Sequence, residues 1–237
     1  MPSVQPSAHE SLVVDSGLPK YYDAAVAIPS PGFETLARTA RENHVFLSLG
    51  IIEKEGGTPY YTAFLLDRDV TLLYEYRKSQ LIPTAAERLI WGRGSGDGLI
   101  VADTAIGKVG GLICWENYMP TARLALCHKG IENSVGPNAD DLPSWIAKCS
   151  TSRKKAAVSS STQINSANDR KPDGTAWTAN DGGSRVIGPL GTFLAEPVWD
   201  NEEIVYAELR MGELTEAKMD FSFDPVGSHS RPGVFWN

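Results

Sequence analysis

The chain has 237 residues, of which 42% are hydrophobic and 22% charged, and its formal net charge is −7. This balance is ordinary for a globular protein with a substantial core, and the acidic charge gives no reason to expect nucleic acid or an anionic membrane as a partner. The sequence predicts a cytoplasmic protein. Its three cysteines have no paired spacing, Met1 to Ser11 has no signal-peptide pattern, and no apolar run is long enough to cross a bilayer.

The first regular element is predicted after an aperiodic start. Gly17 to Ser30 shows no periodicity and is expected to be irregular. Gly32 to Asn43 has apolar residues at helical spacing and predicts an amphipathic helix. The apolar run from Val45 to Ile52 predicts a strand that is buried on both faces.

Two antiparallel strand pairs are expected next. The first joins Thr58 to Leu66 with Thr71 to Arg77 through a turn in which Val70 stands where glycine is usual. The second joins Leu99 to Asp103 with Lys108 to Ile113 around Gly107.

Cys114 directly follows the second pair, at the point where a strand becomes a turn. Pro120 then begins a helix that we expect to end near Lys129, with Gly130 as a left-handed stop. Gly110 and Gly111 would let another backbone approach closely. Backbone N–H groups at such a turn can face a substrate, which is where a nucleophilic thiolate is useful, although most isolated cysteines are simply buried small hydrophobes.

The second half of the chain changes character after Trp145. Lys148 to Asp181 is rich in Ser, Lys, Asn and Thr, so it is expected to be irregular. Order is expected in strands at Ile131 to Val135, Ser184 to Gly188, Thr192 to Ala195 and Ile204 to Leu209, then a helix at Glu213 to Met219 and an extended tail from Asp220 to Asn237. Helices that alternate with paired strands predict one layered α/β domain over residues 1–237.

Several blocks of the sequence resemble the nitrilase branch of the carbon–nitrogen hydrolases. The resemblance runs from about Pro31 to Ser144 and from Gly183 to Phe235. The matching blocks are Gly50 to Thr58, Pro83 to Gly92, Gly111 to Pro120, Pro137 to Asp141, Gly183-Ser184, Pro189 to Gly191 and Ser230 to Pro232. It implies an αββα sandwich that pairs into homo-oligomers, dimers or spirals, and that hydrolyses small-molecule nitriles to carboxylic acid and ammonia without a metal or organic cofactor.

The resemblance also assigns roles to single residues. Cys114 matches the nucleophile that would form a thioimidate and then a thioester, and Glu87 matches an acidic residue beside the catalytic cation. The Trp115 N–H would stabilise the anionic intermediate, and Glu116 and Asn117 would orient the turn. Left open are Glu87 as a solvated helix charge and Glu116 as a cap of the next helix.

The catalytic lysine has two alignments. Tyr76-Arg77-Lys78 places it at Lys78, whereas counting back from Leu81-Ile82-Pro83-Thr84 places it at Gln80. We favour Lys78, because only an ammonium both offsets negative charge and donates a proton. Of the other residues in the matching blocks, Glu53 is expected to be exposed and Trp91 to be core or pocket wall.

One departure affects the activity. The family's general base is a glutamate after a Phe-Pro pair, and Phe-Pro-Glu does not occur in this sequence. The fold is therefore expected to lack its first strands, and the alternative to a nitrilase is a catalytically impaired, truncated or mis-spliced relative that acts as a non-catalytic subunit. A metal or redox protein using the three cysteines and His128 is disfavoured, since paired ligand spacings are absent.

Overall fold

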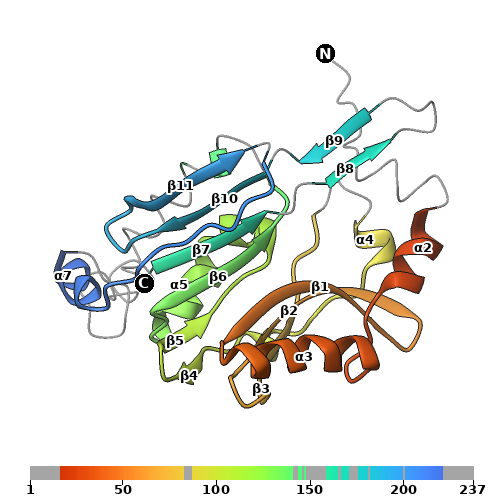
Figure 1. The fold of residues 1–237 in the computed structure, drawn as a ribbon, viewed down its shortest axis with the longest axis horizontal. Helices are drawn as coiled ribbons and strands as arrows, with labels where there is room; N and C mark the ends of the chain where they lie inside the picture. The colour runs from red at the N-terminus through yellow and green to blue at the C-terminus, as the bar shows by residue number, and fades with distance from the viewer. Residues whose placement is uncertain are drawn as a thin grey trace, which may run out of the picture. The chain divides into compact units, whose positions relative to one another are not determined.

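The computed structural model describes residues 17–82, 87–140, 144–145, 147, 159–164, 167–170, 176–180, 182–199 and 201–220. Residues divide by proximity into two compact units, Met1–Leu99 and Ile100–Asn237. Each unit combines helices with a β-sheet, so the fold is mixed α/β, as the sequence predicts (Figure 1).

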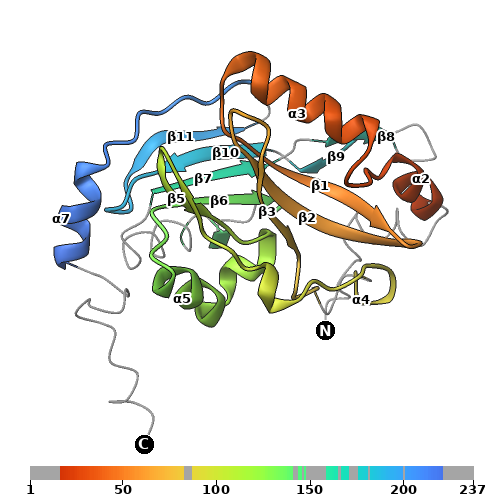
Figure 2. The ribbon, with the colours of Figure 1, turned by 90° about the horizontal axis from the view of Figure 1, so that it is seen from below.

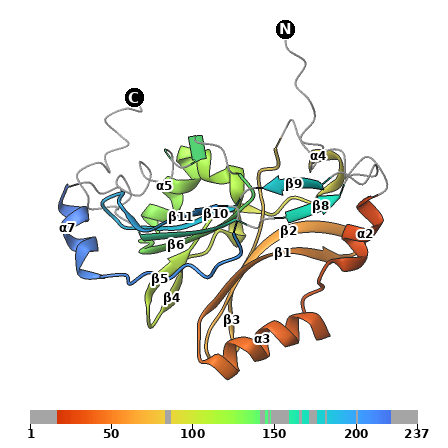
Figure 3. The same cartoon turned by 45° about the horizontal axis from the view of Figure 1, so that its top comes forward.

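The first unit is a three-stranded antiparallel sheet with a long helix against it. The sheet has the order β1-β2-β3, and the elements are α2 (Gly17–Ala24), α3 (Pro31–Asn43), β1 (Leu47–Glu55), β2 (Thr58–Leu66), β3 (Leu72–Arg77), α4 (Glu87–Ile90) and the 3₁₀-helix η1 (Gly96–Gly98). Helix α3 runs along one face of the sheet (Figure 3).

Helix α3 confirms the predicted amphipathic helix. Ser30 is its N-cap, with the hydroxyl accepting a hydrogen bond from the Phe33 N–H at 3.2 Å, and Pro31 stands in the first turn. Phe33, Ala37 and Ala40 are buried, and the Phe33 ring meets Phe64 of β2 edge to face at 5.4 Å. The apolar stripe of α3 therefore forms the core on this face of the sheet.

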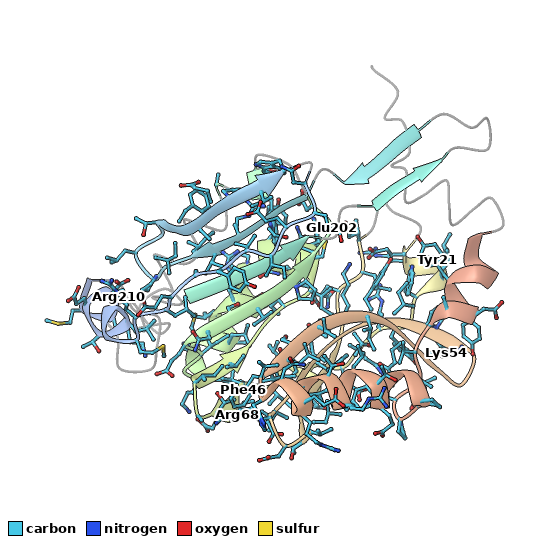
Figure 4. All side chains as sticks on the ribbon, viewed as in Figure 1. Tyr21, Phe46, Lys54, Arg68, Glu202 and Arg210 are labelled. Carbon is cyan, nitrogen blue, oxygen red and sulfur yellow. The ribbon has the colours of Figure 1, made fainter. Side chains whose placement is uncertain are left out.

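Strand β1 corrects two predictions. It is half-exposed along most of its length, so burial on both faces is wrong. Strand β2 pairs with one of its edges, and among the described residues the other edge carries one isolated bridge, from Val26 to Glu53. The second correction concerns Gly17 to Ser30, which was expected to be irregular but contains helix α2. Lys54 of β1 holds this helix by donating to the carbonyls of Tyr22 and Asp23, both at 3.1 Å. Lys54 reaches from β1 to the end of α2 (Figure 4).

The hairpin of β2 and β3 is confirmed, including its unusual turn. Val70 has φ 73°, a left-handed conformation that is costly for a β-branched residue. The Asp67 carboxylate supports the turn by accepting from the N–H groups of Asp69 and Thr71, both at 2.8 Å. The Arg68 guanidinium also lies over the Phe46 ring at 5.3 Å (Figure 4).

The second unit is built on a six-stranded sheet of order β11-β10-β7-β6-β5-β4, parallel from β5 to β7 and antiparallel outside (Figure 2). Helix α5 covers one face (Figure 3). The elements are β4 (Ala102–Thr104), β5 (Gly107–Gly110), η2 (Cys114–Tyr118), α5 (Pro120–His128), β6 (Asn133–Asn138), β7 (Ser159–Ile164), β8 (Ala167–Arg170), β9 (Ala176–Asn180), β10 (Gly182–Ile187), β11 (Phe193–Trp199) and α7 (Gly212–Asp220).

Helix α5 and helix α7 confirm the predicted helices of this unit, and Gly130 has the expected left-handed φ of 76°. The strands at β4, β5, β10 and β11 also confirm predictions, although β6 starts two residues later than expected. Among the described residues, no helix is long and apolar enough to cross a bilayer.

Two predictions for this unit are wrong. The polar segment 148–181 contains β7, which pairs with β6 on one side and β10 on the other, since backbone pairing does not require apolar side chains. Ile204 to Leu209 forms no strand despite its alternating pattern, and Ile204 and Tyr206 are 71% and 80% exposed. The predicted tail beyond Asp220 lies outside the described residues.

Candidate active site

The first unit holds a buried ion pair between two of the predicted site residues. The Lys78 ammonium donates to both carboxylate oxygens of Glu87, at 3.1 and 2.9 Å. Lys78 follows β3 and Glu87 begins α4, and both are buried. The Ile82 N–H donates to the same carboxylate at 2.8 Å. Two residues that the resemblance places beside each other thus lie in contact, and Glu87 is not a solvated helix charge.

Lys78 is held through its backbone and by an aromatic wall. Its N–H donates to the Tyr61 carbonyl at 2.8 Å, and its carbonyl accepts from the Gly94 N–H at 3.0 Å. The ammonium lies 4.9 Å from the Tyr61 ring centre, and the Trp91 ring stacks on the Tyr61 ring with centroids 3.8 Å apart. Trp91 is buried, which agrees with its expected place in the core or pocket wall.

The two possible lysine positions differ sharply in their surroundings. Lys78 is 2% exposed and paired with Glu87, whereas Gln80 lies on the surface, after a bend at Ser79. A buried ammonium beside a carboxylate is the arrangement that the chemistry needs. The structure therefore pairs Lys78 with Glu87 and leaves Gln80 exposed, while Lys78 as the catalytic lysine stays a prediction.

Glu53 corrects the sequence analysis, which expected it to be exposed. It is 1% exposed, and its carboxylate accepts from the Thr62 hydroxyl at 2.6 Å. Arg77 binds both carboxylate oxygens through Nε and Nη2. The prediction failed because Glu53 is followed directly by the charged residues Lys54 and Glu55, and no sequence signal shows that a guanidinium 24 residues later will pair with it.

The second unit holds the Cys114 turn, which contains the remaining predicted site residues. Strand β5 ends at Gly110, and an ideal Cβ on Gly111 would stand 1.7 Å from the Val135 carbonyl oxygen, so only glycine allows this approach. Cys114 then opens η2 with φ 48°, in the left-handed region that non-glycine residues rarely adopt. Cys114 is half-buried, whereas Cys127 in α5 is buried.

Glu116 and Asn117 fix this turn from inside. The Glu116 carboxylate accepts from the Ile113 N–H at 3.1 Å, which makes it a cap of η2. The Asn117 amide donates to the carbonyls of Leu112 at 2.8 Å and Cys114 at 3.1 Å. Both side chains are buried, and together they hold the backbone on either side of Cys114.

A hydrogen bond between Tyr118 and Asp140 links the turn to the segment after β6, and the sequence analysis did not predict this contact. The Tyr118 hydroxyl donates to the Asp140 carboxylate at 2.8 Å, and the Tyr118 ring meets Trp145 edge to face at 5.5 Å. Asp140 belongs to the matching block Pro137 to Asp141, which was the available signal. Trp115, whose N–H is the expected anion donor, is half-buried.

Taken unit by unit, the first unit holds a cation and a carboxylate in Lys78 and Glu87, and the second unit holds a candidate nucleophile in Cys114. These are the groups that covalent hydrolysis through a thioester requires. The Lys78–Glu87 pair belongs to the first unit, and Cys114 with Glu116 and Asn117 belongs to the second. Among the described residues, no three His, Cys, Asp or Glu side chains gather as metal ligands would. Cys149, which belonged to the disfavoured metal hypothesis, lies outside them.

Comparison with known proteins points to one family. The family model "Carbon-nitrogen hydrolase" matches residues 13–219. The chain is 38% identical to Nitrilase 2 and 40% identical to Nitrilase 1 of Arabidopsis thaliana, and each alignment covers 91% of this chain. It spans 66% and 65% of the lengths of these two relatives. A nitrilase of Bradyrhizobium diazoefficiens is 37% identical, with 68% of that protein covered.

Solved structures agree on the fold. A carbon-nitrogen hydrolase from Helicobacter pylori G27 superposes with a TM-score of 0.74 at 24% identity, covering 84% of this chain and 73% of that one. The C. elegans NitFhit protein gives a TM-score of 0.76 at 20% identity, covering 93% of this chain and 54% of that one.

Proposed function

The chain belongs to the carbon–nitrogen hydrolase family, and from this premise we propose that it is a nitrilase-type hydrolase that converts an organic nitrile and two waters to a carboxylic acid and ammonia. The observation that carries the proposal is the 38–40% identity to plant nitrilases over 91% of the chain. The buried Lys78–Glu87 pair and the strained Cys114 turn are consistent with it.

In the proposed reaction the Cys114 thiolate adds to the nitrile carbon. The nitrile nitrogen takes up a proton, and the product is a thioimidate. Water then adds to the thioimidate carbon, and ammonia leaves to give a thioester. A second water releases the carboxylic acid and returns the thiol. Both water additions pass through tetrahedral intermediates that donors such as the Trp115 N–H would stabilise.

Lys78 and Glu87 are proposed to act as one charged unit in these steps. The ammonium of Lys78 would face developing negative charge and donate a proton, while Glu87 keeps the lysine in place. Because the sequence has no Phe-Pro-Glu, Glu87 is also the first candidate for the base that deprotonates Cys114 and activates water. An unassisted thiol has a pKa near ~8.5 and is mostly neutral at pH 7.

Glu116 and Asn117 are proposed to keep the nucleophile in its reactive conformation. Their hydrogen bonds hold the backbone of Leu112, Ile113 and Cys114. A left-handed residue costs on the order of 1–3 kcal/mol unless its surroundings fix it, and these two buried side chains supply that constraint.

Ammonia release over a panel of aliphatic, aromatic and arylacetic nitriles tests the proposal. Cys114→Ala should abolish release and leave the thermal melt unchanged, since alanine and cysteine meet the same backbone constraint at φ 48°. The matched control is Cys127→Ala, in α5, which should keep its activity. Activity that survives in Cys114→Ala would refute the mechanism.

The second candidate function is a catalytically impaired relative that serves as a non-catalytic subunit. The observation that favours it is the absence of Phe-Pro-Glu from these 237 residues. It would hold if a monodisperse, cooperatively melting protein turned over none of the nitriles. The αββα sandwich, the missing first strands and the homo-oligomer remain predictions for this chain, and size-exclusion chromatography tests the last of them.

A further inference from the structure

The ion pair between Arg77 and Glu53 lies on one face of the sheet of the first unit, and the Lys78–Glu87 pair lies on the other face. Arg77 and Lys78 are neighbours, so their side chains point to opposite faces. The Arg77 guanidinium lies over the Tyr60 ring at 4.3 Å, and the Lys78 ammonium lies over the Tyr61 ring at 4.9 Å. Each cation therefore meets a carboxylate on its own side of the same strand end.

The pair between Arg77 and Glu53 has the geometry of a firm clamp. The guanidinium binds both oxygens of the Glu53 carboxylate, one of them from Nε at 2.9 Å, and the Thr62 hydroxyl donates to that same oxygen at 2.6 Å. Glu53 lies on β1, Thr62 on β2 and Arg77 at the end of β3, so one buried carboxylate ties all three strands together. Bidentate arginine–carboxylate pairs combine strength with a fixed orientation.

The backbone beside this clamp has little room to shift. Thr62 is the direct partner of Arg77 in the β2–β3 register, and an ideal Cβ on Gly94 would stand 2.0 Å from the Arg77 carbonyl oxygen. Gly94 also donates to the Lys78 carbonyl. A movement of the Arg77 side chain would therefore be passed to the Lys78 backbone.

We propose that the Glu53–Arg77 pair is a positioning device that fixes the end of β3, and so sets the place of the Lys78 ammonium on the opposite face. The role in turnover rests on the proposed function of Lys78. Glu53 itself does not reach the reacting atoms, because its carboxylate is occupied by Arg77 and Thr62 on the face covered by α3.

The chain offers a matched control for this proposal. Glu55 also binds Arg77, through Nη1 at 2.7 Å, but its side chain is 64% exposed. Exposed ion pairs contribute little, so Glu55→Gln should change every readout by less than about twofold. Glu53→Gln keeps the size of the side chain and removes the charge from the buried partner.

Two readouts separate positioning from a general loss of stability. In steady-state hydrolysis of a nitrile that the wild type accepts, kcat of Glu53→Gln should fall by about 10- to 100-fold, as expected for a misplaced catalytic group, with KM changed less than about twofold. In acetylation of the folded full chain by an N-hydroxysuccinimide ester, followed by digestion and mass spectrometry of the peptides, Lys78 should react at least about tenfold faster, because its protected site opens. Lys54, on the same strand as Glu53, is the internal reference and should be unchanged.

The outcomes distinguish this proposal from the proposed function. If the wild type hydrolyses no nitrile, the proposed function fails and the acetylation rate of Lys78 alone decides the positioning role. Unchanged acetylation in folded Glu53→Gln, or equal effects of Glu53→Gln and Glu55→Gln, would overturn the proposal. If Glu53→Gln does not fold, Thr62→Val decides in its place: it removes one hydrogen bond and should raise the Lys78 rate by about threefold, and an unchanged rate would count against the clamp.

Discussion

Replacing the Lys78–Glu87 pair by apolar residues should show that the two charges stabilise the fold only together. In Lys78→Met the Glu87 carboxylate stays buried with the Ile82 N–H as its remaining described donor, and in Glu87→Leu the ammonium stays buried without its carboxylate. The side chains are only 2% and 8% exposed, so water cannot replace the lost partner. Removing one partner of such a pair costs about 3–5 kcal/mol.

The double variant Lys78→Met/Glu87→Leu should be far more stable than the sum of the singles predicts. Apolar replacement of a whole buried ion pair is often close to neutral, and the loss that remains here is the hydrogen bond to the Ile82 N–H, about 1 kcal/mol. The expected coupling between the two positions is therefore several kcal/mol. The double variant should nevertheless release no ammonia from nitriles, since it lacks the cation.

Urea denaturation of the four proteins measures these differences, with the slope m checked for constancy between variants. Costs below about 1 kcal/mol for both single variants would mean that solvent reaches the pair. Additive costs in the double variant would show that the two charges do not depend on each other. Either result would refute the view of Lys78 and Glu87 as one buried unit.

Three further substitutions have defined outcomes. Gly94→Ala should lower stability by about 1–3 kcal/mol in thermal denaturation, because its Cβ would meet the Arg77 carbonyl oxygen at 2.0 Å; an unchanged melting temperature would show that the backbone moves aside. Asn117→Asp should cost about 2 kcal/mol or more and abolish ammonia release, since a carboxylate cannot donate to the carbonyls of Leu112 and Cys114; wild-type turnover would contradict its role. Burial, and then the negative charge of Glu53, raise the pKa of Glu75, although Arg77 opposes this shift. Ionisation of Glu75 therefore destabilises the folded state once the pH exceeds the ordinary pKa of a glutamate. Glu75→Gln should raise the melting temperature more at pH 7 than at pH 4, and a larger increase at pH 4 would contradict this direction.

Local signals in the sequence predicted the elements that carry their own start and stop residues. Helix α3 was predicted from the helical spacing of its apolar residues, although its N-cap Ser30 and Pro31 were not used, and the helix from Pro120 was predicted from that proline and from the left-handed Gly130. Strand β7 was missed because its sequence, Ser-Ser-Ser-Thr-Gln-Ile, has almost no apolar pattern, and its place in the sheet comes from backbone pairing with β6 and β10.

The candidate site shows the same division between local and distant information. The turn at Cys114 and the contact of Glu87 with Lys78 involve residues at most nine positions apart, and the resemblance identifies them. The Glu53–Arg77 contact joins residues 24 positions apart. The two side chains meet only after three strands have paired, so no local sequence pattern indicates the Glu53–Arg77 contact. The prediction that Glu53 is exposed was therefore wrong.

The bridge at Val26 has a consequence for how this protein behaves in a concentrated solution. Its N–H donates to the Ile52 carbonyl at 2.9 Å, and its carbonyl accepts from the Lys54 N–H at 3.0 Å, so it occupies hydrogen-bonding groups on the outer edge of β1. A strand from another molecule would need those groups to extend the sheet. Cleavage of the chain between α2 and α3 would free Val26 from the edge of β1. The cleaved protein would then expose that edge, pair with strands of other molecules and precipitate first.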